Sequence, residues 1–382
     1  MSVQRPPLPI AKPLMGAGEL EAVRAVLESG WLTQGPWVKR FETEFAARHH
    51  VAHALATTSC TTALHLALEV LDVGPGDEVI VPAFTWVATA NVVLHRGATP
   101  VFVDVLDDTY NIDPSEVARR LSPRTKAVMA VHLFGLCADM DALAAVLPEH
   151  VSVIEDAACA AGASYHGRAA GGLGRVGCFS FHPRKSITCG EGGMLTMNEA
   201  SLALRAERLR NHGAMVAEEV RHRGLKPYEL PDFEDAGYNF RMTDIQAAVG
   251  VVQLGSLDAF IAARATLAGA YDKALGSLQW ITPPVRPAGY GHALQSYVAR
   301  VSPDAPIARD DILARLHEAG IGARPGTHSV VGLSVYRERL GTNPRDYPRS
   351  TALQAETLAL LLHNHMTDTD VARVVEVLEK MQ

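Results

Sequence analysis

A lysine between an apolar segment and a glycine-rich turn is the residue of this sequence with the clearest chemical potential. Lys185 follows the string Ser180-Phe-His-Pro-Arg and precedes the string GEGG at residues 190–193. A lysine that is partly removed from water loses its proton more readily, and the neutral amine is a nucleophile that forms Schiff bases. Most lysines, however, are solvated surface residues. Lys185 by itself therefore does not decide the chemistry.

An aspartate stands where a buried strand is expected to end. The string Val153-Ile-Glu-Asp156 is followed by Ala-Ala-Cys-Ala-Ala. A carboxylate at this place can pair with the protonated nitrogen of a pyridine ring and keep that ring an electron sink. It can equally be the N-cap of a helix. Asp156 alone leaves both interpretations open.

The polar turn Thr58-Ser-Cys-Thr61 precedes an apolar helical stretch. Free backbone N–H groups and the helix dipole at such a start can hold a phosphate, although an ordinary N-cap is the competing interpretation. Cys60 stands at the expected helix start, where the dipole favours the thiolate. Further along, Trp86 in the string AFTWVAT either stacks on a planar ring or belongs to the core. The turn and the tryptophan are candidate contacts to one ligand.

Short apolar strands alternate with amphipathic helices in the first half of the chain. The pattern predicts strands at residues 53–57, 78–82, 99–105, 127–134, 151–157, 178–182 and 194–197. It predicts intervening helices at residues 62–71, 88–97, 114–121 and 141–149. This alternation is typical of βαβ units and a mostly parallel sheet. Ligands bind at the carboxyl ends of such strands, where Thr58–Thr61, Thr85, Trp86, His132 and Asp156 fall.

The second half of the chain changes character. The glycine string at residues 171–177 precedes a strand and does not open a helix, which excludes a dinucleotide-binding fingerprint. A polar stretch near residues 215–235 predicts a surface excursion or lid, and long helices are expected over residues 242–275. The remainder mixes strands with helices. We predict an α/β fold with a large domain, 1–254, and a smaller C-terminal α/β domain, 255–382.

Composition and charge exclude several classes of protein. The 48% of apolar and 20% of charged residues are typical of a globular chain, and the formal charge of −7 argues against a nucleic-acid binder. No segment is long and apolar enough to cross a bilayer, and the proline-rich start lacks the apolar region of a signal peptide. We therefore expect no nucleic-acid partner and no membrane association.

The cysteines and histidines point to a cytoplasmic protein without a metal. Five scattered cysteines form no CxxC pair, so neither a disulfide framework nor a zinc site is indicated, and a reducing cytosol fits best. The clusters His49–His53 and His363–His365 have no cysteine or carboxylate at ligand spacing. Ordinary structural histidines are the favoured interpretation.

The order of phosphate turn, stacking aromatic, ring-nitrogen aspartate and lysine resembles fold-type I enzymes that use pyridoxal 5′-phosphate (PLP). More narrowly, the chain resembles the DegT/DnrJ/EryC1/StrS family of sugar aminotransferases. The resemblance runs from about residue 10 to residue 254 and continues more weakly to the end. It rests on these strings: SGWLTQGPWVKRFETEFA, TSCTTALHLAL, GDEVIVPAFTWVATANVV, GATPVFVDV, VHLFGLCADM, VIEDAACAAGA, GCFSFHPRKSITCGEGGML, LRNHG and AGYNFRMTDIQAAVGVVQL.

The resemblance implies a role for each matching residue. Lys185 would carry PLP as a Schiff base and move the proton, Asp156 would pair with the pyridine nitrogen, and Trp86 would stack on the ring. Phosphate binding is implied for Cys60, Thr61 and Ser180. Asn239, with Arg241 close by, would reach the phosphate in the neighbouring subunit. The resemblance thus implies a homodimer whose active sites are shared between subunits.

Two positions depart from the family pattern. Cys159 stands where relatives often have glutamine or histidine against the ring hydroxyl, and a thiol is a poorer hydrogen-bond partner. Gly326-Thr-His328 stands where many relatives have Pro-Leu-His. Contacts with the substrate are expected from Trp31, His182, Arg324 and His328, whose segments should face the acceptor.

The function implied is transfer of an amino group from glutamate or glutamine to a keto sugar, with a nucleotide-linked keto-deoxyhexose as acceptor. Two alternatives stay open, namely a keto-inositol aminotransferase and a non-catalytic PLP-binding regulator. The lysine argues against a PLP sugar dehydratase, whose relatives have histidine at that position. Arg324 could grip a diphosphate of the acceptor or the carboxylate of the donor.

Overall fold

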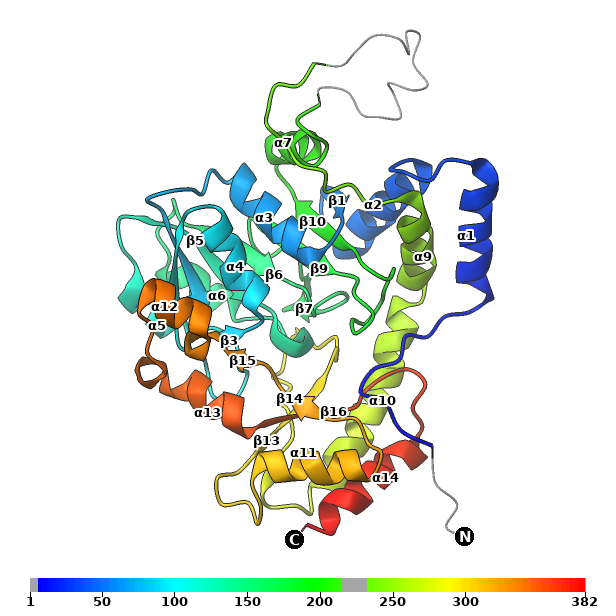
Figure 1. The fold of residues 1–382 in the computed structure, drawn as a ribbon, viewed down its shortest axis with the longest axis vertical. Helices are drawn as coiled ribbons and strands as arrows, with labels where there is room; N and C mark the ends of the chain where they lie inside the picture. The colour runs from blue at the N-terminus through cyan, green and yellow to red at the C-terminus, as the bar shows by residue number, and fades with distance from the viewer. Residues whose placement is uncertain (1–5, 215–231, 382) are drawn as a thin grey trace.

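The computed structural model describes residues 6–214 and 232–381 and is built on a large and a small sheet (Figure 1). The large sheet has seven strands in the order β1-β10-β9-β6-β5-β2-β4. The bounds of its strands are β1 (His53–Thr57), β2 (Glu78–Pro82), β4 (Thr99–Val103), β5 (Thr125–Val131), β6 (Ser152–Asp156), β9 (Val176–Ser180) and β10 (Gly193–Met197). Strand β10 is antiparallel to both of its neighbours, and the other pairs are parallel. The predicted α/β fold with a mostly parallel sheet is confirmed.

Helices cover both faces of the large sheet. One face carries α2 (Pro36–His49), α5 (Pro114–Arg120), α6 (Met140–Val146) and α9 (Asp244–Gly255). The other face carries α3 (Cys60–Val70), α4 (Val87–His95) and α7 (Ala200–Arg210). Successive side chains of a strand pack into the hydrophobic cores on opposite faces of the sheet. Ile80 packs on the first face, and Val79 and Val81 pack on the second. This two-sided burial explains why the strands read as continuous apolar runs.

The small sheet is antiparallel, in the order β11-β13-β16-β14, with helices packed on it. Its elements are β11 (Ile281–Thr282), β13 (Tyr297–Val301), β14 (Arg324–Pro325), β16 (Thr357–Leu360), α10 (Leu257–Leu275), α11 (Arg309–Glu318) and α14 (Asp368–Glu379). The N-terminal segment joins this part, because Leu8 and Ile10 pack on its core. Conversely, Tyr336 and Tyr347 pack in the core of the large sheet. The domain boundary after residue 254 stays a prediction.

The remaining elements are short or lie at the rim of the molecule. They are α1 (Ala17–Ser29), β3 (Phe84–Thr85), η1 (Leu133–Gly135), β7 (Ser164–Tyr165), β8 (Arg168–Ala169), β12 (Tyr290–Gly291), β15 (His328–Ser329), η2 (Val330–Gly332), α12 (Ser334–Leu340), η3 (Pro344–Asp346) and α13 (Pro348–Glu356). The predicted polar lid near residues 215–235 falls mostly outside the described residues. In the described ranges no single helix could span a membrane, and only α9 and α10 taken together, across a 57° bend, meet the length and composition criterion.

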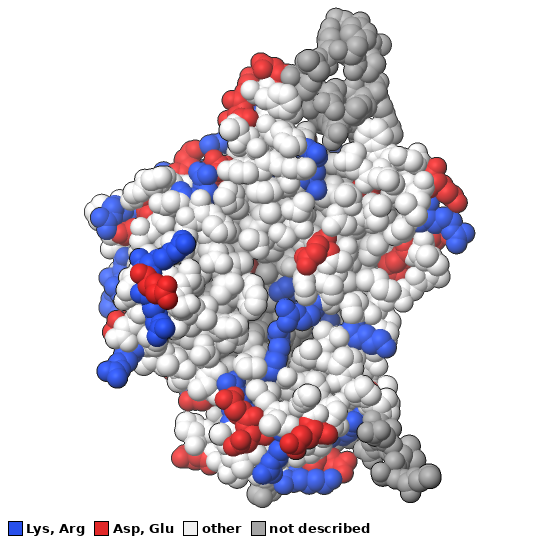
Figure 2. Space-filling model, viewed as in Figure 1, with Lys and Arg blue, Asp and Glu red and all other residues white. Residues whose placement is uncertain are grey.

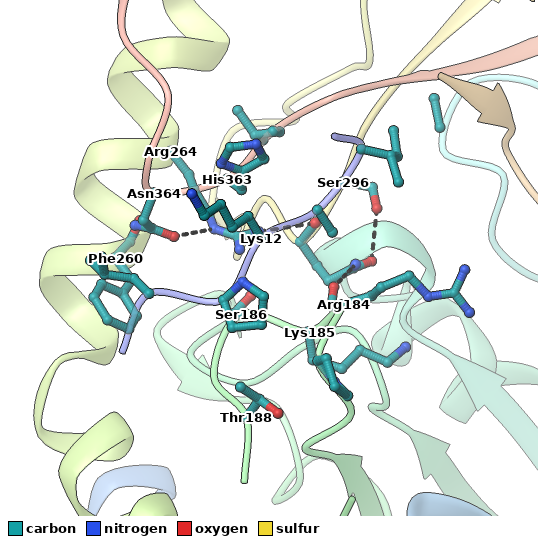
Figure 3. Close-up of a pocket in the computed structure, with 18 of the residues that line it drawn as sticks. Lys12, Arg184, Lys185, Ser186, Thr188, Phe260, Arg264, Ser296, His363 and Asn364 are labelled. Atoms are coloured by element: carbon teal, nitrogen blue, oxygen red, sulfur yellow. Dashed lines mark hydrogen bonds between the residues drawn. The ribbon is translucent and has the colours of Figure 1, made fainter. Parts of the chain in front are cut away.

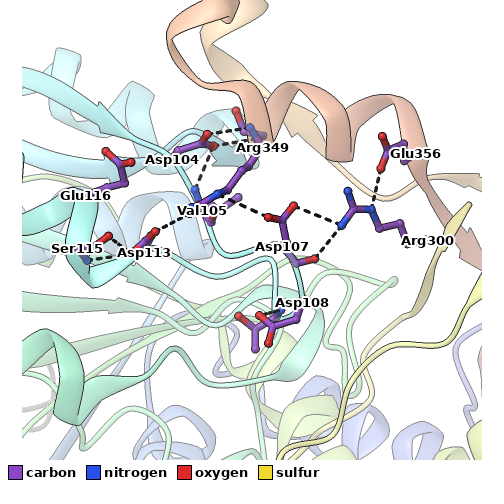
Figure 4. Close-up of polar contacts among 12 residues, drawn as sticks. Asp104, Val105, Asp107, Asp108, Asp113, Ser115, Glu116, Arg300, Arg349 and Glu356 are labelled. Carbon is purple, nitrogen blue, oxygen red and sulfur yellow. Dashed lines mark hydrogen bonds and ion pairs between the residues drawn. The ribbon is translucent and has the colours of Figure 1, made fainter. Parts of the chain in front are cut away.

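Three sets of contacts hold the segment 328–356 against the large sheet. Strand β15 pairs with β3, so that His328 lies opposite Thr85. Around α13, the backbone N–H of Arg349 donates to Asp104 Oδ2 at 2.8 Å, and its guanidinium pairs with Asp113 (Figure 4). Arg300 of β13 bridges Asp107 at 3.3 Å and Glu356 at 2.7 Å. These contacts place the walls of one cavity, described next.

Candidate active site

A cavity of about 930 Å³ lies at the carboxyl ends of the parallel strands, where the two sheets meet. Figure 2 shows basic side chains gathered in the hollow between the two parts of the molecule. All but two of the site residues predicted from the sequence line this cavity. Those that line it are Cys60, Thr61, Trp86, Asp156, Cys159, Ser180, His182, Lys185, Arg324 and His328. Trp31 and Asn239 do not line it.

Lys185 lies in the turn that follows β9. Its backbone N–H donates to His182 O at 2.8 Å, which closes the turn. Its Nζ lies 3.2 Å from Cys159 Sγ. The cysteine at the departing position thus contacts the lysine itself, a neighbour that the family pattern did not indicate. The lysine is half-buried, as the sequence context predicted.

Asp156 ends β6 with its carboxylate buried at the cavity wall. It is 5% exposed, and its Oδ2 accepts a hydrogen bond of 2.8 Å from Thr89 Oγ1 while its Oδ1 accepts from Ala158 N at 3.2 Å. Burial raises the pKa of this carboxyl, and the Thr89 hydroxyl opposes that rise. Turns follow at residues 157–163, so the helix N-cap interpretation is wrong.

A second buried carboxylate stands directly before Asp156. Glu155 is fully buried and accepts backbone N–H bonds of 2.6, 2.8 and 2.7 Å from Gly171, Leu173 and Gly174. His132 Nε2 lies 2.9 Å from Glu155 Oε2, and its Nδ1 accepts from Ala138 N, so Nε2 carries the proton. The glycine string therefore forms a loop of donors around a carboxylate. Sequence reasoning missed this role of Glu155.

The turn before α3 has the donors that a phosphate requires. Ser59 caps the helix through Thr62 N, and no hydrogen bond from Cys60 N or Thr61 N to another described residue is found. Gly193 packs under the turn so closely that a Cβ there would lie 2.3 Å from Ser59 O. Ser180 Oγ lies on the same wall of the cavity. The backbone of the turn is thus free to bind an anion.

The thiol of Cys60 points away from the solvent. Its Sγ lies 3.6 Å from Cys178 O and 4.0 Å from Asp156 Oδ1. Burial raises the pKa of the Cys60 thiol well above its ordinary value, and the Asp156 carboxylate raises it further. The expectation that the helix dipole favours a thiolate here is wrong, because desolvation outweighs the dipole.

Trp86 faces the cavity. It is 54% exposed, and its ring meets that of His328 edge to face at 5.5 Å. The core-tryptophan interpretation is therefore wrong, and a ring face is free to stack on a planar ligand. The pairing of β15 with β3 sets the position of His328.

Two guanidinium groups line the cavity beside Lys185. Arg324 and Arg184 form no ion pair with another described residue, and Arg324 Nε is buried without a hydrogen-bond partner. Burial lowers the pKa of Arg324, and the charge of Arg184 lowers it further. Sequence reasoning missed Arg184, although it directly precedes the lysine. Such a pair of cations is suited to an anionic ligand.

The two remaining predicted residues lie on the outer surface of the chain. Trp31 sits in the loop between α1 and α2, and its indole N–H donates to Gln34 O at 3.1 Å. Asn239 is exposed, and its neighbours Tyr238 and Phe240 stack on each other with centroids 4.7 Å apart. Within one chain, neither residue reaches the cavity that the sequence assigned to it.

Comparison with known proteins gives the family. Residues 13–379 match the model of the DegT/DnrJ/EryC1/StrS aminotransferase family. The chain is 41% identical to the spore coat polysaccharide biosynthesis protein SpsC of Bacillus subtilis, over 97% of this chain and 95% of that protein. It is 38% identical to GDP-perosamine synthase of Caulobacter vibrioides, over 98% of both.

A solved relative shows the same architecture. The Streptococcus pneumoniae protein Spr1654, in its PMP form, superposes with a TM-score of 0.92 at 29% identity and covers 98% of both chains. Spr1654 is also solved in a PLP form, in agreement with the cofactor predicted here. The chain therefore belongs to the DegT/DnrJ/EryC1/StrS aminotransferase family and is a PLP-dependent aminotransferase.

Proposed function

We propose that this enzyme moves an amino group from glutamate or glutamine to a keto sugar, and that the acceptor is a nucleotide-linked keto-deoxyhexose. The observation that carries the proposal is the pair Arg184 and Arg324, which line the cavity beside Lys185 without an ion-pair partner among the described residues. Guanidinium groups bind phosphate oxygens in a bidentate geometry. One relative, GDP-perosamine synthase, is likewise named after a nucleotide-linked sugar.

The size of the cavity supports the same class of acceptor. Its volume of about 930 Å³ lies at the upper end of the range for sites that enclose drug-sized ligands. PLP would take part of this space, and a nucleotide sugar would use more of the remainder than an amino acid would. A free keto-inositol has no phosphate to neutralise the two arginines, so their charge favours the nucleotide sugar.

The cavity wall fits the cofactor. We assign the pyridine nitrogen to the buried Asp156 carboxylate, the phosphate to Cys60 N, Thr61 N and Ser180 Oγ, and the ring face to Trp86. The two N–H groups lack other partners in the described chain, and Asp156 is a buried anion that a protonated ring nitrogen would neutralise. When bound, PLP supplies the electron sink that stabilises negative charge at the substrate carbon.

The residues of this chain then have distinct tasks. The Lys185 amine would bind the cofactor carbonyl and afterwards remove and return the proton at the substrate carbon. Cys159, at 3.2 Å from Nζ, would hold that amine at the cavity wall. Asp156 would keep the ring nitrogen protonated, and Glu155 with His132 would fix the strand end that presents it. His182 and His328 would contact the acceptor.

We propose that Trp31 and Asn239 act in the active site of a partner subunit. Tyr238 and Phe240 stack together, so the alternation of an extended backbone directs Asn239 away from them, toward the outside. Trp31 belongs to a loop whose backbone bonds to Asp244, close in sequence to Asn239. The same region carries exposed apolar side chains, which are Leu14, Met15, Leu20, Leu27 and Leu32. A second copy of the chain that covers them would form a homodimer with shared sites.

A substrate panel tests the proposed function. Purified enzyme is incubated with PLP, with glutamate or glutamine, and with nucleotide-linked keto sugars or keto-inositols. Mass spectrometry then detects the aminated product. We expect turnover of a nucleotide keto sugar and none of the uncharged keto-inositols. Turnover of a keto-inositol alone would overturn the acceptor assignment, and cofactor binding without any turnover would favour a regulator.

A further inference from the structure

A second, small cavity lies beside the lysine turn, between Lys12, Ser186 and Arg264 (Figure 3). Its volume is about 30 Å³, enough for one particle of the size of a water molecule or a halide ion. The N-terminal segment at Lys12, helix α10 at Arg264 and the loop after β16 at Asn364 enclose it. The residues between Pro183 and Thr188 form the wall toward the active site.

The lining of this cavity is positively charged. Its lining includes five basic residues, Lys12, Arg184, Lys185, Arg264 and Arg324, of which only Arg264 is buried. The charged ends of Arg184 and Lys185 point away from Arg264 (Figure 3). Neither aspartate nor glutamate is among the described residues that line it. A buried positive charge is costly unless an anion compensates it. The cavity thus combines a net positive wall with a space for a single small particle.

Arg264 carries the clearest need for a counterion. It is 5% exposed, and its guanidinium bonds only to neutral acceptors, Asn364 Oδ1 at 3.0 Å and the carbonyl oxygens of Leu294 and Gln295 at 3.2 and 3.0 Å. Burial lowers the pKa of Arg264 to about 10, and no carboxylate offsets this effect. Its Nη2 makes no hydrogen bond with the rest of the described chain.

Two further polar atoms at the cavity lack a partner. Ser186 is 5% exposed, and its Oγ is buried without a hydrogen bond. Arg324 Nε, on the side shared with the active site, is buried without one as well. A buried hydroxyl or N–H that meets no acceptor destabilises the folded protein, because it has lost its hydrogen bonds to water. Several unpaired donors around one space are the arrangement that an anion satisfies.

We infer that this cavity is a binding site for a small monovalent anion of halide size, held by Arg264, Ser186 and Lys12. The anion neutralises the buried guanidinium and accepts from the Ser186 hydroxyl. Because Ser186 follows Lys185 directly, the bound anion also ties the lysine turn to α10 and to the N-terminal segment. The site is separate from the phosphate turn at Cys60 and does not depend on which keto compound is the acceptor.

One lining atom favours a different occupant. His363 Nε2 lies 3.2 Å from Pro9 O and donates to it, so Nδ1 presents a lone pair, and this atom is buried without a partner. A water molecule could donate to that lone pair, whereas an anion could not. An ordered water is therefore the occupant that the experiment has to distinguish from an anion.

Bromide serves as the probe because it scatters anomalously. Crystals of the holoenzyme are soaked in sodium bromide, and anomalous data are collected at the bromine edge. We expect a peak in the cavity within hydrogen-bonding distance of Arg264 and Ser186. Density without an anomalous signal would identify a water molecule and overturn the inference.

A solution measurement excludes binding that occurs only in crystals. Holoenzyme is unfolded with urea at constant ionic strength, in chloride or in gluconate, which is too large for the cavity. At a chloride concentration ten times Kd, the ratio of folded to unfolded protein rises about tenfold. Ser186→Ala and Lys12→Gln should reduce this rise, whereas the matched surface variants Ser201→Ala and Lys39→Gln should retain it. A bromide peak with no chloride effect in solution shows binding at crystal concentration only and also overturns the inference.

Discussion

Thr89 Oγ1 donates a hydrogen bond of 2.8 Å to Asp156 Oδ2, and Thr85 Oγ1 lies 3.0 Å from Thr89 Oγ1 in turn. All three side chains are buried. Helix α4 thus supports the carboxylate that ends β6, and it does so beside the ring of Trp86 at the start of the same helix. A hydroxyl at this place stabilises the charged form of Asp156 against the effect of burial.

Thr89→Val keeps the shape of the side chain and removes the donor. The pKa of Asp156 should rise further, and the carboxylate should pair less well with a ring nitrogen. We expect the affinity for PLP to fall about tenfold, the scale of a hydrogen bond to a charged group. Absorbance titration of the apoenzyme measures this. Thr357→Val is the matched control, because its buried hydroxyl donates to Leu353 O and Thr357 does not line the cavity. Equal affinity in wild type and Thr89→Val would contradict the assignment.

Asp156→Asn separates stability from catalysis. Burial raises the folded-state pKa of Asp156, so its contribution to stability is fully present below the ordinary aspartate pKa and is lost as the pH rises through the folded value. At neutral pH the apoenzyme variant should therefore be more stable than wild type, by about 1–3 kcal/mol. This gain should vanish in acid.

The same variant should bind PLP yet transaminate far more slowly, because a neutral amide cannot hold the ring nitrogen protonated. Urea denaturation of both apoenzymes, between acid and neutral pH, measures the difference in the free energy of unfolding. Single-turnover absorbance measurements give the rate of transamination. Wild-type turnover with the cofactor in place would refute the role of Asp156.

Lys185→Ala should fold and lose the covalent link to the cofactor. Borohydride reduction followed by mass spectrometry of the chain should label wild type and leave the variant unlabelled. Lys39→Ala is a suitable control, since Lys39 is exposed and does not line the large cavity. Covalent labelling of the Lys185→Ala chain would show that another lysine holds PLP.

Arg324→Lys keeps the charge and loses the bidentate geometry. If Arg324 grips a diphosphate, the KM for the acceptor should rise about tenfold while the donor half-reaction stays near wild type. Arg40→Lys is the control for replacing an arginine by a lysine, because Arg40 lies on α2 and pairs with Glu44 at 2.7 Å. Loss confined to the donor half-reaction would instead make Arg324 a donor carboxylate site, and a keto-cyclitol would become the better acceptor.

Mixing two inactive variants tests the shared site. In a mixed dimer of Lys185→Ala and Asn239→Ala chains, one site receives both defects and the other receives none. After subunit exchange, activity should recover to about a quarter of wild type, since half of the dimers are mixed and half of their sites are intact. Absence of recovery despite demonstrated exchange would place Asn239 outside the partner's site.

Local sequence determined most of the cavity wall. Apolar runs of strand length predicted β2, β5 and β6. Because parallel strands end at the same edge of a sheet, the residues that follow strand ends, such as Cys60, Trp86 and Asp156, lie together there. The place of Lys185 at the cavity also followed from local sequence, because its turn lies between a strand and a glycine string. These inferences succeeded because each depends on residues within about ten positions of one another.

Tertiary structure decided what depends on distant residues. The pKa of Cys60 is raised because Asp156 and Cys178, far away in sequence, enclose its thiol, so the local helix dipole was a poor guide. The glycine string at residues 171–174 surrounds Glu155, and Arg264 bonds to carbonyl oxygens some 30 residues away. Burial and hydrogen bonding are sums over everything packed around a group, and the packing brings together residues whose spacing along the chain carries no periodic signal.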